Sequence, residues 1–357
     1  MPLVANVSLP SFTHLQQEGA TVISRDQAEA QDIRELHIGL LNMMPDKALV
    51  ATERQFFRLV GESNQIAQFY MHPFTLKELV RGAEGQAYVT QHYQSFEQIQ
   101  EEGLDALIIT GANVTGLELS DQPFWFPLNK VIDWAYENVT STLLSCLATH
   151  TVLEFRYQQK RSPLVNKRWG VYPHFVTAKD HPLVLGVNTR FDVPHSRFNT
   201  IEREQFIASN LQVLVESETA GVHLAVSEDG FRMVFFQGHP EYDTVSLLKE
   251  YKREIGRYAN KEIDQYPSIP ENYFSLRSTA ILQEFANKIK QARADNSPPP
   301  PFPEALIVSV LDNTWRDSAE AVINKWIGKV YQITNIDQRK PFHSTIDPQD
   351  PLGLKNS

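Results

Sequence analysis

Short runs of apolar residues alternate with stretches of helical periodicity through residues 36–150. The runs have the length of buried strands and occupy residues 36–42, 66–71, 106–109 and 143–146. Between them, Pro45 opens a helix that ends with Gly61 as its C-terminal cap, and two further helices are predicted over 96–102 and 131–137. Strands that alternate with helices in this way predict an α/β fold with a parallel, doubly wound sheet.

The pattern changes beyond residue 170. Three short strands are predicted, over 211–215, 222–226 and 233–236. Asp229-Gly230 has the composition of a hairpin turn between the last two. Three helical segments form a C-terminal elaboration, over 247–255, 281–289 and 315–331. The prolines at 298–301 are typical of a stiff polyproline spacer.

These features divide the chain into three parts. Residues 1–35 are expected to be an irregular segment that packs on the core. Residues 36–338 form the main domain, with a proline-rich insertion near 275–312, and residues 339–357 form a polar tail.

Composition narrows the function classes. The net charge of −10 argues against a nucleic-acid partner, and an anionic substrate would need a local basic pocket. No apolar stretch approaches the roughly 20 residues of a membrane span. The first residues lack the basic-then-apolar pattern of a signal peptide, so we expect a cytoplasmic protein. Motifs for metal, nucleotide triphosphate or dinucleotide binding are absent from the sequence.

The single cysteine, Cys146, lies where a predicted buried strand turns into a helix. Such a turn exposes a side chain at the carboxyl edge of a sheet and points the first amides of the helix at its target. These amides can activate a thiol and hold an oxyanion. Taken alone, a free cysteine is more often a small buried core residue than a nucleophile.

A thiol nucleophile needs a base, and the base needs a partner that orients it. His239 follows Gly238 at the end of a predicted strand, and Glu241 stands two residues further on. The alternative for this segment is a polar turn after an edge strand. His150 lies one helical turn after Cys146 and is expected to pack inside rather than act as the base.

Several ordered motifs resemble the homoserine O-acyltransferase family, usually called homoserine O-succinyltransferases, which share a fold with class I glutamine amidotransferases. The resemblance runs from about Leu36 to about Gln338. Its motifs are LNMMP at 41–45, LIITGA at 107–112, NVTSTL at 138–143, GVY at 170–172, PHSR at 194–197, GHPEYD at 238–243, NYF at 272–274 and WR at 315–316.

The resemblance implies a role for each matching residue. It makes Cys146 the acyl-thioester nucleophile, His239 the general base and Glu241 its partner. The amino-acid substrate positions correspond to Lys167, Ser196 and Arg253. A lysine and an arginine are natural ligands of a substrate carboxylate.

Other positions depart from the family pattern. Leu147 stands where the family has Trp, His150 where it has Gln, and Asn113 where it has Pro, so all three are candidate pocket residues together with Lys47. Donor choice is implied at Thr115, where glycine accompanies succinyl-CoA and glutamate accompanies acetyl-CoA. Threonine carries no charge that would repel the succinyl carboxylate, which favours succinyl-CoA.

The implied reaction is acyl transfer from succinyl-CoA to the hydroxyl of L-homoserine, a step in methionine biosynthesis. The acyl-CoA is a substrate, and neither a cofactor nor a metal is expected. Acetyl-CoA as donor, L-serine as acceptor, and a glutamine amidotransferase-like hydrolase remain alternatives. A homodimer is the expected assembly if the chain self-associates.

Overall fold

The computed structural model describes residues 3–64, 67–114, 116 and 118–355. Within these residues, the strands are β1 (Leu3–Ala5), β2 (Val22–Ser24), β3 (Glu35–Leu41), β4 (Gln68–Phe74), β5 (Ala106–Ile109), β6 (Ser141–Ser145), β7 (Ser162–Val176), β8 (Arg190–Thr200), β9 (Gln212–Ser217), β10 (Gly221–Val226) and β11 (Met233–Phe236). They form one eleven-stranded sheet in the order β2-β1-β4-β3-β5-β6-β11-β10-β9-β7-β8.

The helices connect and cover these strands. They are α1 (Pro10–Gln17), α2 (Arg25–Glu29), α3 (Asp46–Ser63), α4 (Ala83–His92), α5 (Phe96–Glu102), α6 (Trp125–Asn138), α7 (Leu147–Tyr157), α8 (Arg203–Ala208), α9 (Ser246–Ala259), α10 (Leu276–Ala294), α11 (Glu304–Val308) and α12 (Arg316–Ile333). The described helices include none that is long and apolar enough to cross a membrane.

The α/β prediction is confirmed, and the sheet has a parallel half and an antiparallel half. From β2 to β11 every neighbouring pair is parallel. From β11 to β8 every pair is antiparallel. The parallel half ends at β11, so the carboxyl ends of β6 and β11 lie side by side at the centre of the sheet.

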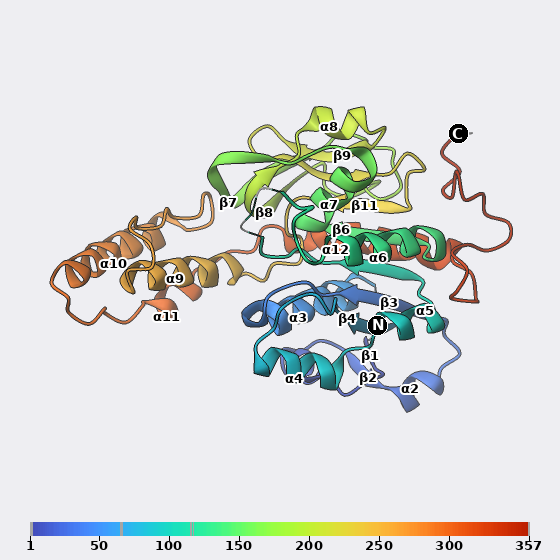
Figure 1. Ribbon diagram of the computed structural model, residues 1–357, viewed down its shortest axis with the longest axis horizontal. Coiled ribbons are helices and arrows are strands. Elements are labelled where there is room, and N and C mark those ends of the chain that lie inside the picture. The colour runs from blue at the N-terminus through green and yellow to red at the C-terminus, as the bar shows by residue number, and fades with distance from the viewer. Residues whose placement is uncertain (1–2, 65–66, 115, 117, 356–357) are drawn as a thin grey trace.

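Helices cover both faces of the parallel half (Figure 1). On one face, α3 and α12 bury Phe56, Phe57 and Trp326 against strand residues such as Ile38 and Ile108. A second apolar layer on the other face contains residues of α5, α6 and α7. The strands are therefore apolar on both sides, which explains their continuous apolar runs.

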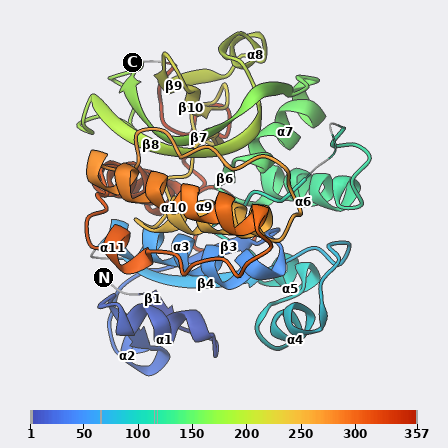
Figure 2. The same cartoon turned by 90° about the vertical axis from the view of Figure 1, so that its left-hand side faces the viewer.

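Helices α9, α10 and α11 extend away from the sheet (Figure 1) and cross in front of it in the perpendicular view (Figure 2). They pack around Tyr251, Leu282 and Phe285, and Trp169 of β7 joins the same cluster. The predicted C-terminal elaboration is thus present, and the insertion near 275–312 contains the whole of α10 and α11.

Three features differ from the sequence prediction, and one prediction cannot be compared with the described residues. The segment 1–35 is not irregular, because β1 and β2 extend the sheet and α1 and α2 pack beside them. Gly61 is not a cap, because α3 continues to Ser63; instead, a Cβ at Gly61 would lie 2.9 Å from Leu3 Cγ. The long strands β7 and β8 have no counterpart in the apolar pattern. The predicted start of the second strand at Ile66 lies outside the described residues.

Candidate active site

Cys146 occupies a sharp turn between β6 and α7. Its φ of 52° and ψ of −106° are unusual for a residue with a side chain, and such strain is characteristic of a nucleophile turn. The Cys146 amide donates a 2.8 Å hydrogen bond to Phe236 O at the end of β11. This bond fixes the cysteine at the carboxyl edge of the sheet.

The amino end of α7 provides hydrogen-bond donors beside Cys146. The first hydrogen bond within α7 runs from the His150 amide to Cys146 O, at 3.3 Å. The amides of residues 147–149 therefore have no acceptor within the helix. The loop after β5 borders the same space, since a Cβ on Gly111 would lie 3.5 Å from Cys146 Cβ. The arrangement suits an oxyanion that forms next to the thiol.

His239 reaches the same edge from the neighbouring strand. Ser145 and Phe236 are register partners of β6 and β11, so the residues that follow these strands emerge together. Gly238 permits the approach, because a Cβ there would lie 2.5 Å from Val193 Cγ1. The His239 amide then donates to Pro194 O at 2.8 Å.

Glu241 orients the imidazole of His239. His239 Nδ1 donates a 2.8 Å hydrogen bond to Glu241 Oε1, and both side chains are buried. Burial acts to lower the pKa of His239, but the charges of Glu241 and the Cys146 thiolate outweigh it and raise the pKa well above the ordinary value. These interactions favour the protonated imidazole of His239 beside Glu241 and Cys146.

Tyr242 connects this triad to a second group of polar residues. Its ring stacks on His239 with centroids 4.3 Å apart, and its hydroxyl donates to Glu250 Oε1 at 2.7 Å. Glu250 Oε2 accepts bonds from Lys167 Nζ at 3.0 Å and Ser196 Oγ at 2.6 Å. Burial would raise the pKa of Glu250, but Lys167, Ser196 and Tyr242 lower it below its ordinary value.

The structure thus brings Lys167 and Ser196 together around Glu250. Arg253 lies one turn further along α9 and is largely exposed, with Nε donating to Glu254 Oε1 at 3.1 Å. Lys167 and Arg253 still interact electrostatically, since Arg253 contributes to lowering the pKa of Lys167, whose main cause is burial. Of the substrate positions implied by the resemblance, Lys167 and Ser196 share Glu250 as a hydrogen-bond partner, whereas Arg253 pairs with Glu254.

The remaining candidate residues have different environments. Lys47 is exposed in the first turn of α3, and Asn113 is exposed in the loop after β5. Leu147 is buried in the apolar layer beneath α7. His150 is also buried, with Nε2 bonded to Gln237 Oε1 at 3.0 Å and its pKa lowered to about 3 by burial. Thr115 lies outside the described residues.

Sequence reasoning missed Glu250 and Tyr242. Glu250 had one available signal, because it precedes Arg253 by three residues and so shares its helix face. Tyr242 belongs to the GHPEYD segment, but its stacking on His239 depends on the tertiary turn after β11.

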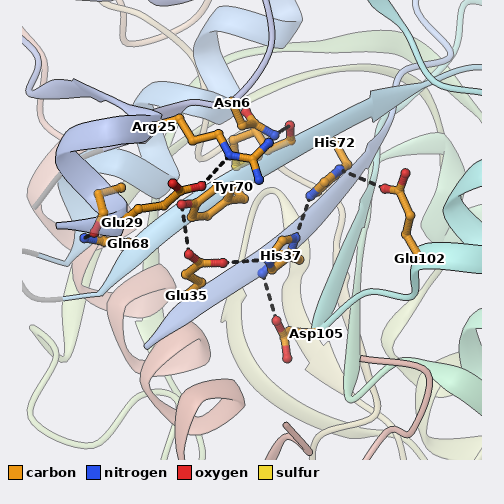
Figure 3. Close-up of polar contacts among 12 residues, drawn as sticks. Asn6, Arg25, Glu29, Glu35, His37, Gln68, Tyr70, His72, Glu102 and Asp105 are labelled. Atoms are coloured by element: carbon orange, nitrogen blue, oxygen red, sulfur yellow. Dashed lines mark hydrogen bonds and ion pairs between the residues drawn. The ribbon is translucent and has the colours of Figure 1, made fainter. Parts of the chain in front are cut away.

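A separate group of hydrogen-bonded polar residues lies on β3 and β4 (Figure 3). His37 Nδ1 and His72 Nε2 are hydrogen-bonded at 2.9 Å, and Glu35 accepts from Tyr70 at 3.0 Å. The His37 amide donates to Asp105 at 2.8 Å. Burial lowers the pKa of His72 to about 4.

The fold and the geometry of the site define a class of protein. It is an α/β protein whose central parallel strands present a cysteine at a nucleophile turn beside a buried His–Glu pair.

The comparisons specify the family. The family model described as homoserine O-succinyltransferase matches residues 2–336. A homoserine O-succinyltransferase from Nitrosococcus oceani is 68% identical, and one from Allochromatium vinosum is 63% identical, each match covering 99% of both chains. A solved glutamine amidotransferase from Thermotoga maritima is similar with a TM-score of 0.43 and 11% identity, covering 83% of this chain and 98% of that one. The chain belongs to the homoserine O-succinyltransferase family.

Proposed function

We propose that this protein transfers a succinyl group from succinyl-CoA to the hydroxyl of L-homoserine, with Cys146 as the nucleophile. The name shared by its relatives supports the reaction. The observation that carries the mechanism is the position of Cys146 beside the His239–Glu241 pair. The resemblance-based alternatives of acetyl-CoA, L-serine or glutamine as substrate have no comparable support.

The first half-reaction forms an acyl-enzyme. The thiolate of Cys146 attacks the thioester carbonyl carbon, and the amides at the start of α7 stabilise the oxyanion. The bond from carbon to the CoA sulfur breaks, and the leaving thiolate takes a proton from the His239 imidazolium. His239 is then neutral and can act as a base.

The second half-reaction consumes the acyl-enzyme. His239 removes the proton of the homoserine hydroxyl, whose oxygen attacks the acyl carbonyl carbon. The bond to Cys146 Sγ breaks, which restores the thiolate and the imidazolium. Both steps use residues of this chain, and neither requires a cofactor.

The polar group around Glu250 is suited to the acceptor. Glu250 offers a carboxylate for an ammonium group, and Lys167 and Arg253 offer cations for a carboxylate. An amino acid held by these residues would lie next to Tyr242 and therefore next to His239.

The test is a matrix of purified protein with succinyl-CoA or acetyl-CoA as donor and L-homoserine or L-serine as acceptor, measured by release of free CoA thiol. The proposal expects turnover to be highest with succinyl-CoA and homoserine. In the absence of acceptor, intact-protein mass spectrometry should show one succinyl group, which Cys146→Ala abolishes. Full turnover by Cys146→Ala would refute the covalent mechanism.

A further inference from the structure

An open hollow of about 330 Å³ lies on the antiparallel half of the sheet. Its wall comes mainly from residues 164–168 of β7, with Tyr172, Thr219 and Glu271. Its size is within the usual range of ligand pockets. Lys167 lines the hollow and also bonds Glu250, so the hollow adjoins the candidate active site.

The shape of the hollow originates in an irregularity of β7. Pro163 pairs with Asn199 and Arg168 pairs with Arg197, so four residues of β7 oppose Phe198 alone. Bulges of this kind redirect side chains and are common next to active sites. Here the bulge leaves Val165 fully exposed, and Phe198 is 66% exposed, which provides apolar surface beside the hollow.

Two arginines without a carboxylate partner meet at this place. Arg168 Nη1 and Arg197 Nη2 both donate to Ala220 O, at 3.1 and 2.7 Å. Among the described residues, no carboxylate forms an ion pair with either guanidinium. Burial lowers the pKa of Arg197 to about 10, and Arg168 contributes to the same effect by repulsion. An anion bound in the hollow would offset this repulsion.

Glu271, the carboxylate that lines the hollow, forms no ion pair within the described part of the chain that would offset the repulsion between these arginines. Glu271 interacts with the hydroxyl of Tyr172, and burial together with this carboxylate raises the pKa of Tyr172 to about 12. Arg197 also interacts electrostatically with Cys146.

We propose that the hollow beside Arg168 binds the phosphate groups of the acyl donor's nucleotide, with Val165 and Phe198 as its apolar border. This inference rests on the proposed function, which requires a coenzyme A thioester. A nucleoside bisphosphate combines anionic oxygens with an apolar base, and the hollow combines a guanidinium that has no ion-paired carboxylate among the described residues with exposed apolar side chains. In a chain of net charge −10, such a local cation is needed to hold a polyanionic donor.

The first test measures binding without catalysis. Calorimetry with CoA and with adenosine 3′,5′-bisphosphate should show binding that weakens about 10- to 150-fold in Arg168→Gln, the loss of one charge-assisted hydrogen bond. Arg168→Lys should retain part of the affinity. The matched control is Arg190→Gln, an exposed arginine at the far end of β8, which should bind like the wild type. Unfolding curves confirm that each variant is folded.

The second test separates the phosphates from the succinyl carboxylate. The KM for succinyl-CoA should rise in Arg168→Gln, whereas transfer from succinyl-N-acetylcysteamine, which lacks phosphates, should show no matching loss. Equal losses with both donors would overturn the proposal in favour of carboxylate recognition, and unchanged bisphosphate binding would also overturn it. Failure of the proposed function is distinguishable, because the wild type would then transfer from neither donor.

Discussion

Replacement of Glu241 by glutamine tests the electrostatic basis of the triad. The amide keeps the size of the side chain and can still accept a hydrogen bond, but it removes the charge 2.8 Å from His239 Nδ1. Both groups are at most 10% exposed, so solvent screens their attraction weakly. A hydrogen bond between charged groups contributes about 1.5–3 kcal/mol, which corresponds to a decrease of about 10- to 150-fold in the acylation rate.

The same substitution should change the pH dependence. In the wild type the charges of Glu241 and the thiolate raise the pKa of His239, so the imidazolium persists above neutral pH. Without the carboxylate this pKa falls, and the proton donor for the leaving CoA thiolate is lost at lower pH. The basic limb of the acylation profile should therefore move to lower pH.

Single-turnover release of CoA thiol, recorded from pH 5 to 10 without acceptor, measures both effects. Glu218→Gln, which removes an exposed carboxylate from the turn between β9 and β10, is the matched control and should behave as wild type. A Glu241→Gln variant with the wild-type rate and an unmoved basic limb would refute the assigned role of this carboxylate.

Three further outcomes are expected. Arg253→Ala should raise the KM for homoserine about tenfold while acyl-enzyme formation stays intact, since the arginine is proposed to contact only the acceptor. Steady-state and single-turnover kinetics measure the two half-reactions, and equal losses in both would contradict this role. Gly170→Ala should lower the free energy of unfolding by about 1–3 kcal/mol, because its Cβ would lie 2.2 Å from Glu271 O. Gly256→Ala, in open space on α9, should raise the free energy of unfolding by up to about 1 kcal/mol. Urea titrations of the two variants measure both effects. The free energy of unfolding should fall as the pH drops from about 6.5 toward 4. Burial lowers the pKa of His72, His174 and His181 to about 4 in the folded protein, so the unfolded chain takes up protons at higher pH than the folded protein does. A urea midpoint that is unchanged between pH 7 and 5 would contradict this sign.

The apolar pattern predicted β3, β4, β5, β6 and β11 of the parallel half but missed β1 and β2. The bounds of β5 and α5 match the prediction because each is a short element with a clear local signal, and Ser95 forms a capping box with Gln98 before α5. Strand β7 gave no such signal, because its exposed half contains Pro163, Asn166 and Lys167 and its partners are distant in sequence.

The functional site could likewise be predicted only in part from the sequence. Cys146 and His239 could be identified because each follows a recognisable strand, and adjacent parallel strands release their residues at one edge. The sequence did not indicate that Glu250 contacts Lys167 and Ser196, because these residues belong to three elements that meet only after β7, β8 and α9 have packed.

The position of α12 has a consequence for synthesis of the protein. This helix covers the same face of the sheet as α3, and its Trp326 donates a 2.8 Å hydrogen bond to Ser141 Oγ of β6. Until residues 316–333 have left the ribosome, α3 covers only part of that face, and the apolar surface beneath α12 stays exposed. The core can therefore close only after α12 has been synthesised, and a nascent chain that pauses before this helix should depend on chaperones to avoid aggregation.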